Sequence, residues 1–201
     1  MRQTRTLGQY RAIDLGIWAV LLLVFETILF KAGTVWFPAE AYMVSLSAVI
    51  TAVVMMRWGA WALIHALLAG ALDAWLLRSS GSAVHWAVYP AGALLCVTGL
   101  LIRRLWGPEG IRTSWLKTLV FGGVILLSMQ AGRALTALLL GYEAASALHF
   151  ITEDVVTLLF TLAVLWVVRR LDGVFEDQRL YLKRVRRETE QEEAEGKGGF
   201  Q

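Results

Sequence analysis

The 201-residue chain is short of charged residues and has one cysteine, and each shortage excludes a class of protein. Charged residues make up 17% of the chain, against about 25% in an ordinary soluble domain, so a soluble globule fits poorly. Cys96 has no partner for a disulfide or a cysteine metal site. The H-E-x-x-H, G-x-S-x-G, Walker A and dinucleotide-binding patterns are also missing. We therefore expect no catalysis and no bound metal or cofactor.

Long apolar blocks dominate what is present. Hydrophobic residues make up 57% of the chain, the mean hydropathy is +0.58, and blocks of about 17 to 26 residues match the length that crosses a bilayer as a helix. They predict an all-α membrane bundle of six transmembrane helices within residues 1–170. The predicted spans are Ala12–Phe30, Ala39–Met56, Trp58–Leu77, Ala83–Ile102, Trp115–Leu140 and Ala145–Val168. The first block resembles a signal peptide but is too long for one, so we expect a retained helix.

Basic residues predict the orientation of these spans. With the N-terminus in the cytoplasm, sixteen of the nineteen Lys and Arg residues fall on the cytoplasmic side. Only Lys31 and Arg78 fall outside, and Arg133 lies within a span. We therefore expect both termini in the cytoplasm and a prokaryotic plasma membrane as the location. This bias also explains the pI of about 9.2 without a nucleic-acid partner.

The connections between spans carry further expectations. Arg57-Trp58-Gly59 predicts a tight hairpin between the second and third spans, and residues 103–114 predict a loop because Gly107-Pro108 breaks a helix. Residues 171–201 form a cytoplasmic tail. Apolar residues at helical spacing between Leu171 and Val185 predict an amphipathic helix on the inner membrane face, and the acidic remainder from about Glu188 predicts disorder. The tail is either a topology anchor or a docking surface.

Five ionisable residues fall inside the predicted spans, where each costs about 2.5–3.5 kcal/mol to insert and usually faces a bundle interior. They are Glu26, Asp73, Arg133, Glu153 and Asp154. At about 1.5 Å per residue, all lie in the outer half of the bilayer, roughly 6–14 Å below its surface. A pair between Arg133 and Glu153 or Asp154 would lower the cost of burying both charges. Such a pair either locks two spans together or helps to line a ligand pocket open to the outside.

Aromatic residues and histidines extend this candidate site. His149 and Glu153 are four residues apart and share a helical face. Trp86 and Tyr89 lie at the outer end of the fourth span, as interfacial anchors or as a stacking surface for a flat ligand. The predicted substrate-binding residues are Glu26, Asp73, Trp86, Tyr89, Arg133, His149 and Glu153. A haem between His85 and His149 is a less favoured alternative because both lie at the rim, and the isolated His65 indicates packing.

Small residues predict close helix contacts. Ala12, Gly16 and Ala19 form a strip on the first span, and comparable small residues occur on the third and fourth spans. The latter are Ala66, Gly70, Ala74, Gly92 and Gly99. Such strips let helices approach closely, either within the bundle or against another membrane subunit.

The span pattern, the hairpin Met56–Ala60 and the small residues that follow it to Gly70 resemble the substrate-binding S components of energy-coupling factor transporters. The resemblance implies a six-helix protein with an outer-half pocket for a vitamin-like micronutrient. It also implies a transmembrane coupling subunit, which would contact Ala12, Gly16 and Ala19, and separate ABC-type ATPases. Two alternatives remain: a structural or assembly protein of the cell envelope, similar in span count to the rod-shape membrane proteins, and a haem-bearing membrane subunit.

Overall fold

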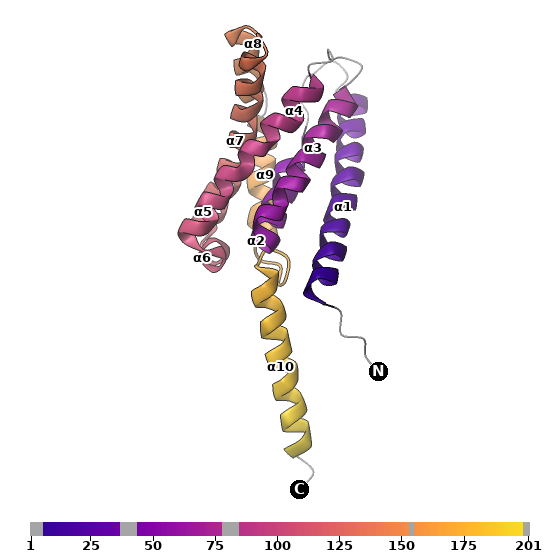
Figure 1. The fold of residues 1–201 in the computed structure, drawn as a ribbon, viewed down its shortest axis with the longest axis vertical. Coiled ribbons are helices and arrows are strands. Elements are labelled where there is room, and N and C mark those ends of the chain that lie inside the picture. The colour runs from indigo at the N-terminus through magenta and orange to yellow at the C-terminus, as the bar shows by residue number, and fades with distance from the viewer. Residues whose placement is uncertain (1–5, 37–43, 78–84, 153–154, 199–201) are drawn as a thin grey trace.

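The computed structural model describes residues 6–36, 44–77, 85–152 and 155–198, and every regular element in these ranges is a helix (Figure 1). Helices satisfy all backbone hydrogen bonds within one segment, which an apolar solvent requires. Four helical stretches are long and apolar enough to cross a membrane: Leu7–Trp36, Ser47–Leu76, Trp86–Trp106 and Trp115–Leu139. The all-helical class is confirmed, and a count of six crossings stays a prediction.

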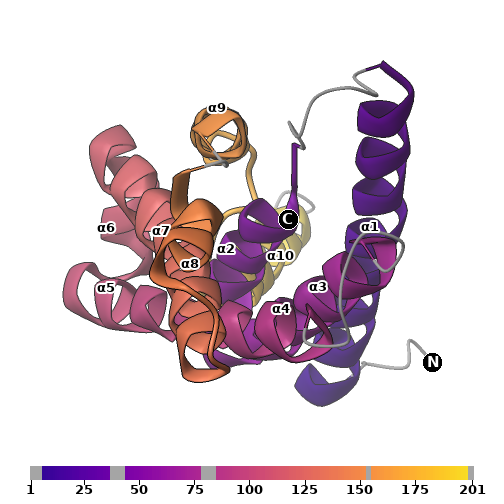
Figure 2. The ribbon, with the colours of Figure 1, turned by 90° about the horizontal axis from the view of Figure 1, so that it is seen from above.

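A hairpin at the centre of the bundle divides the second of these stretches. Helix α2 (Ser47–Trp58) and helix α3 (Ala62–Leu76) are joined by the short 3-10 helix η1 (Gly59–Trp61). Gly59 has φ 64°, a conformation that favours glycine and ends α2, so the predicted tight hairpin is confirmed. All residues of α2 are buried, and the view along the bundle shows α2 surrounded by its neighbours (Figure 2). The prediction that this helix already includes residues 44–46 is wrong.

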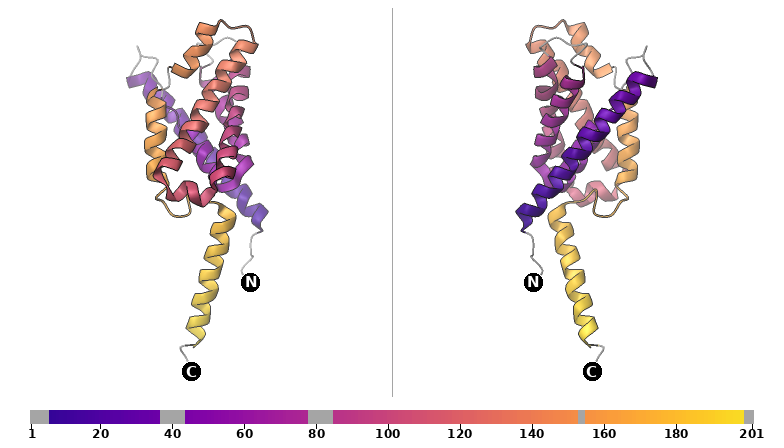
Figure 3. Two further views of the ribbon diagram at one scale, coloured as in Figure 1. Left: turned by 90° about the vertical axis from the view of Figure 1, so that its left-hand side faces the viewer. Right: turned by 90° about the vertical axis from the view of Figure 1, so that its right-hand side faces the viewer.

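Helix α1 (Leu7–Trp36) crosses the rest of the bundle obliquely (Figure 3). Its buried residues are Asp14, Leu22 and Glu26, and most of its remaining surface is apolar and exposed. Asp14 contacts Arg57 near the end of α2, whereas Glu26 contacts Leu46 just before α2 begins. These contacts make α1 and α2 antiparallel.

Two further passes complete one side of the bundle. Helix α4 (His85–Ala93), the 3-10 helix η3 (Leu94–Val97) and helix α5 (Thr98–Trp106) run in succession, and helix α7 (Trp115–Leu139) returns beside them. The predicted break at Gly107-Pro108 is confirmed, but residues 103–114 are mostly helical and do not form the predicted loop. Instead α5 continues to Trp106, Gly107 with φ 68° ends it, and Pro108 starts the short helix α6 (Pro108–Thr113), because proline suits the first turn of a helix.

The predicted sixth span is two helices. Helix α8 (Ala144–Thr152) packs on the end of α7, where Val88, Ala134, Ala137 and Ala147 form a small separate core. Helix α9 (Val155–Val168) packs on α7 and α2 and contributes Leu165 to the main core. With 14 residues, α9 is similar in length to α2 and α3, which have 12 and 15 residues.

The tail was predicted to be an amphipathic helix between Leu171 and Val185 and disordered from about Glu188, and the structure differs in both segments. Residues 171–177 are a loop without a regular helix, and Phe175 within it is fully buried in the main core. Helix α10 (Gln178–Gly198) then runs away from the bundle, through the segment predicted to be disordered (Figures 1 and 3). We call the end of the bundle where α1 begins and α9 ends the N/C end, and the opposite end the far end.

Candidate functional site

An ion pair joins α3 and α7 near the far end of the bundle. The Nη2 atom of Arg133 lies 2.7 Å from Oδ2 of Asp73, and the two side chains are 12% and 11% exposed. The guanidinium carbon of Arg133 lies 4.7 Å from the ring centroid of Tyr89 on α4. Tyr89 in turn contacts Phe150 of α8 edge-on, with ring centroids 5.9 Å apart. We call Asp73, Tyr89 and Arg133 the far-end cluster.

Glycines allow the helices of this cluster to approach one another. A Cβ added to Gly92 on α4 would lie 2.4 Å from the backbone nitrogen of Arg133. One on Gly132 would lie 2.2 Å from the carbonyl oxygen of Gly92, and one on Gly70 would lie 2.5 Å from that of Tyr89. Helix α4 is therefore wedged between α3 and α7, and these small residues serve packing within the bundle.

Glu26 provides a fourth polar group near this level. Its carboxylate accepts a hydrogen bond of 2.8 Å from the backbone N–H of Leu46, the residue before α2. Leu46 has no side chain able to cap that helix, so the carboxylate from α1 satisfies one of the free donors at its start. Glu26 is 5% exposed and lies within electrostatic range of Asp73 and Arg133.

The structure brings together only part of the predicted binding site. Glu26, Asp73, Tyr89 and Arg133 converge, and Arg133 pairs with Asp73, a partner that the sequence did not suggest. Trp86 is 50% exposed on the bundle surface. The following predicted residues or their side chains lie outside the described part of the chain: His85, His149, Glu153 and Asp154.

Two of the three small residues in the strip of α1 face away from the bundle, and the third, Ala19, is half-buried. Ala12 and Gly16 are exposed, and no atom lies within 4 Å of a Cβ added to Gly16. His65 matches its predicted packing role, because its Nε2 lies 3.0 Å from the carbonyl oxygen of Leu15 on α1. Within the described residues, no group of three or more His, Cys, Asp or Glu side chains is placed to hold a metal ion.

A second and larger polar group lies at the N/C end. Arg57 on α2 forms a two-pronged pair with Asp14 on α1, with Nη2–Oδ1 and Nε–Oδ2 distances of 2.5 and 2.9 Å. The indole N–H of Trp58 donates to the same carboxylate at 2.6 Å. The side chains of Arg57 and Asp14 are 7% and 12% exposed. This geometry satisfies most of the hydrogen-bonding capacity of both buried charges.

Arg57 also holds the loop after α9. Its Nη1 donates to the backbone carbonyl oxygens of Gly173 and Val174, the latter at 3.0 Å. Gly173 has φ 71°, and a Cβ there would lie 3.1 Å from the ring of Tyr181, so the turn requires glycine. The ring of Phe175 enters the core and meets Phe121 of α7 at 6.4 Å.

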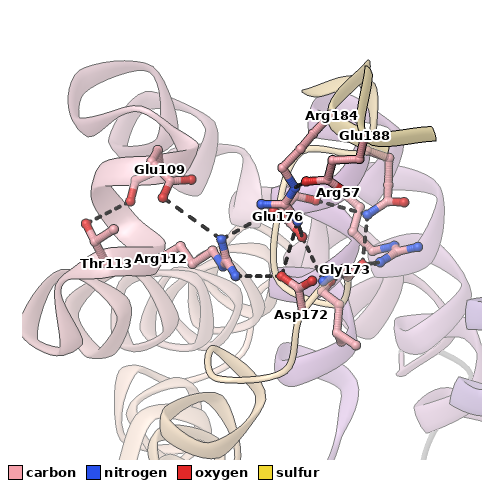
Figure 4. A network of polar contacts seen from close by, with 11 residues as sticks. Arg57, Glu109, Arg112, Thr113, Asp172, Gly173, Glu176, Arg184 and Glu188 are labelled. Atoms are coloured by element: carbon pink, nitrogen blue, oxygen red, sulfur yellow. Dashed lines mark hydrogen bonds and ion pairs between the residues drawn. The ribbon is translucent and has the colours of Figure 1, made fainter. Parts of the chain in front are cut away.

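Three more arginines bind the acidic side chains of this loop (Figure 4). Arg103 of α5 lies 2.5 Å from Asp177; these two residues are not labelled in Figure 4. Arg112 of α6 lies 3.0 Å from Asp172 and 3.3 Å from Glu176, and Arg184 of α10 contacts the same two carboxylates. We call the loop 171–177 with Arg57, Arg103, Arg112 and Arg184 the arginine clamp. The negative charge of Glu176 raises the pKa of Arg184 above its ordinary value, so this residue stays charged.

Sequence reasoning missed the clamp because it assigned these arginines to membrane orientation alone. Asp14 was also overlooked, since it lies close to the predicted start of the first span. One signal was available: Asp172, Glu176 and Asp177 crowd into six residues directly after Arg169-Arg170, and a glycine lies among them. Such a cluster near a basic membrane boundary indicates carboxylates that pair with arginines.

Comparison with known proteins gives no relative for this chain: no family model, no curated protein and no solved structure matches it.

Proposed function

We propose that this chain is a non-catalytic assembly subunit of the cell envelope, crossing the plasma membrane six times with both termini in the cytoplasm. The bundle anchors and orients α10, and α10 docks a cytoplasmic partner protein. The observation that carries this proposal is the arginine clamp. Four arginines from α2, α5, α6 and α10 hold the seven-residue loop that aims α10 away from the bundle.

The distribution of charge supports the orientation. The clamp arginines, the start of α1 and the start of α10 lie at one end of the bundle, which the bias of basic residues assigns to the cytoplasm. The exposed apolar surface of α1, including Ile17, Val20 and Ile28, suits contact with lipid.

The far-end cluster argues for an anchor more than for a ligand carrier. Arg133 is engaged by Asp73 and Tyr89, and Glu26 caps α2, so each of these groups has a partner within the protein, and only the buried Nε of Arg133 lacks one among the described residues. A buried pair of this kind joins helices that would otherwise pack through small residues alone.

A second candidate is the substrate-binding subunit of a micronutrient transporter, working with a coupling subunit and ABC-type ATPases. The observation that favours it is the convergence of Glu26, Asp73, Tyr89 and Arg133 from four helices in one layer. A vitamin-like ligand with hydrogen-bond donors would bind there if it displaced the internal partners. The strip Ala12, Gly16 and Ala19 would then serve as the contact for the coupling subunit.

Purification of the tagged protein from native membranes in a mild detergent tests both candidates. The full chain is compared with a chain that stops after Arg186, which keeps the arginine clamp but removes the outer part of α10. Envelope-assembly proteins that accompany the full chain and are lost from the shortened one support the assembly role. A coupling subunit and two ATPases that accompany both chains establish the transporter instead. Recovery of the protein alone contradicts both.

A further inference from the structure

Six cations at the N/C end of the bundle show two kinds of contact. Those that face the interior of the protein contact carboxylates, as Arg57, Arg103 and Arg112 do. Those on the rim stack on tryptophans instead. The rim cations Arg11, Lys117 and Arg170 form no ion pair with a carboxylate among the described residues.

Each rim cation lies over an indole ring. The distance from the cation to the ring centroid is 4.4 Å for Arg11 on Trp61, 4.3 Å for Arg170 on Trp166 and 5.9 Å for Lys117 on Trp106. Trp61 and Trp166 are 40% and 41% exposed, so both rings form part of the outer surface.

The three cation–tryptophan pairs lie on different sides of the bundle. One joins α1 to η1, one joins Trp166 of α9 to Arg170 just after that helix, and one joins α5 to α7. Helices α1, α9 and α5 lie on different sides of the bundle in Figure 2. Tryptophan rings settle at the depth of the lipid headgroups, so each ring places its cation at the level of the phosphates. Arg57 and Arg133, which face the interior, differ from the rim cations. Each of them contacts an aromatic ring and also a carboxylate.

We propose that these three pairs are binding sites for the phosphate headgroups of anionic phospholipids in the inner leaflet. The indole ring holds the cation, and the lipid phosphate supplies the negative charge that the protein does not. This inference rests on the membrane orientation proposed above and is independent of any protein that α10 docks. A soluble phosphate ester offers similar chemistry, but the exposed rings suit a ligand with acyl chains beside its phosphate.

Binding of phosphatidylglycerol to the purified full chain tests the proposal. Unfolding is followed by a thiol-reactive dye, because Cys96 is the only cysteine and is fully buried. Phosphatidylglycerol, phosphatidylcholine and glycerol 3-phosphate are titrated separately into the detergent solution, and native mass spectrometry counts the lipids that remain bound. We expect phosphatidylglycerol alone to raise the unfolding temperature.

The variant Arg11→Gln/Arg170→Gln separates the sites from a general charge effect. Each lost charge should weaken binding about fivefold, the change expected from ~1 kcal/mol per basic residue near an anionic surface. The matched control Arg186→Gln/Arg187→Gln removes the same charge from α10 and should change binding less than twofold. Trp166→Leu keeps all charges and should weaken binding at one site.

Three outcomes would overturn the proposal. The first is that the control variant weakens lipid binding as much as the rim variant does. The second is that phosphatidylcholine stabilises the protein as well as phosphatidylglycerol does. The third is that glycerol 3-phosphate raises the unfolding temperature as much as phosphatidylglycerol does. A failed search for protein partners of α10 leaves these measurements unaffected, so the two proposals fail separately.

Discussion

The substitution Arg57→Met tests whether the clamp holds the fold at the N/C end. The guanidinium of Arg57 pairs with Asp14 through two contacts and donates to the carbonyl oxygens of Gly173 and Val174. Methionine fills a similar volume but has no donors. Asp14 would keep only the indole N–H of Trp58 as a partner while remaining buried.

The size of the effect follows from the burial of the pair. Removing one partner of a buried ion pair costs about 3–5 kcal/mol, because the remaining charge is left without compensation. For a chain of this length, a loss of that size lowers the unfolding temperature by on the order of 10 °C. The double variant Asp14→Leu/Arg57→Met removes the stranded charge and should recover part of the loss. The carbonyl oxygen of Val174 still lacks its donor in it, at about 1–3 kcal/mol, whereas that of Gly173 keeps the hydrogen bond from the side-chain amide of Gln178.

The buried thiol of Cys96 again serves as the probe of unfolding in detergent. Arg186→Met is the matched control, since Arg186 is 81% exposed and its one ion pair within the described part of the chain is with Glu190. It should cost less than ~0.5 kcal/mol. Equal unfolding temperatures for Arg57→Met and Arg186→Met would refute the structural role of the clamp.

Three further predictions use the same unfolding assay. Gly92→Ala should destabilise the protein by about 1–3 kcal/mol through overpacking against Arg133, whereas Gly16→Ala, with open space around it, should be neutral or slightly stabilising; equal effects would contradict the close approach of α4 and α7. Phe175→Ala should cost about 3–5 kcal/mol by leaving a cavity beside Phe121, and a loss below ~1 kcal/mol would mean that the loop is not anchored in the core. Arg133→Ala should lower stability by about 1–3 kcal/mol because Asp73, with an 11% exposed side chain, loses its charged partner; a fully stable variant that has lost uptake of a nutrient would assign Arg133 to a binding site instead.

Much of the helical framework was predictable because apolar periodicity and length follow from the chain alone. Helix α7, predicted as the fifth span Trp115–Leu140, is found at Trp115–Leu139, and the hairpin at Arg57–Gly59 lies where the short connection placed it. The errors fall where tertiary contacts override local signals. Residues 171–177 carry apolar residues at helical spacing, yet the burial of Phe175 and the bonds from Arg57 hold them as a loop.

In the far-end cluster, too, the sequence predicted local features but not tertiary contacts. Depth counting predicted that Asp73 and Arg133 share a layer, which agrees with their ion pair, because rise per residue is a property of a helix by itself. It did not identify Asp73 as a partner of Arg133. The pairing of Arg133 with Asp73 depends on how closely α4 packs against α7. Gly92 and Gly132 set that distance, because their backbones are in direct contact there.

The sequence by itself determined that this protein is helical, that its apolar blocks are long enough for a membrane, and that its basic residues gather at one end, since composition and spacing are local properties. Only the tertiary structure decided which of those basic residues face a carboxylate and which stack on tryptophan at the rim. The physical reason is that a charge is neutralised by whatever lies within a few ångströms of it, and the neighbours of Arg57 and Arg103 come from segments more than forty residues away in the chain.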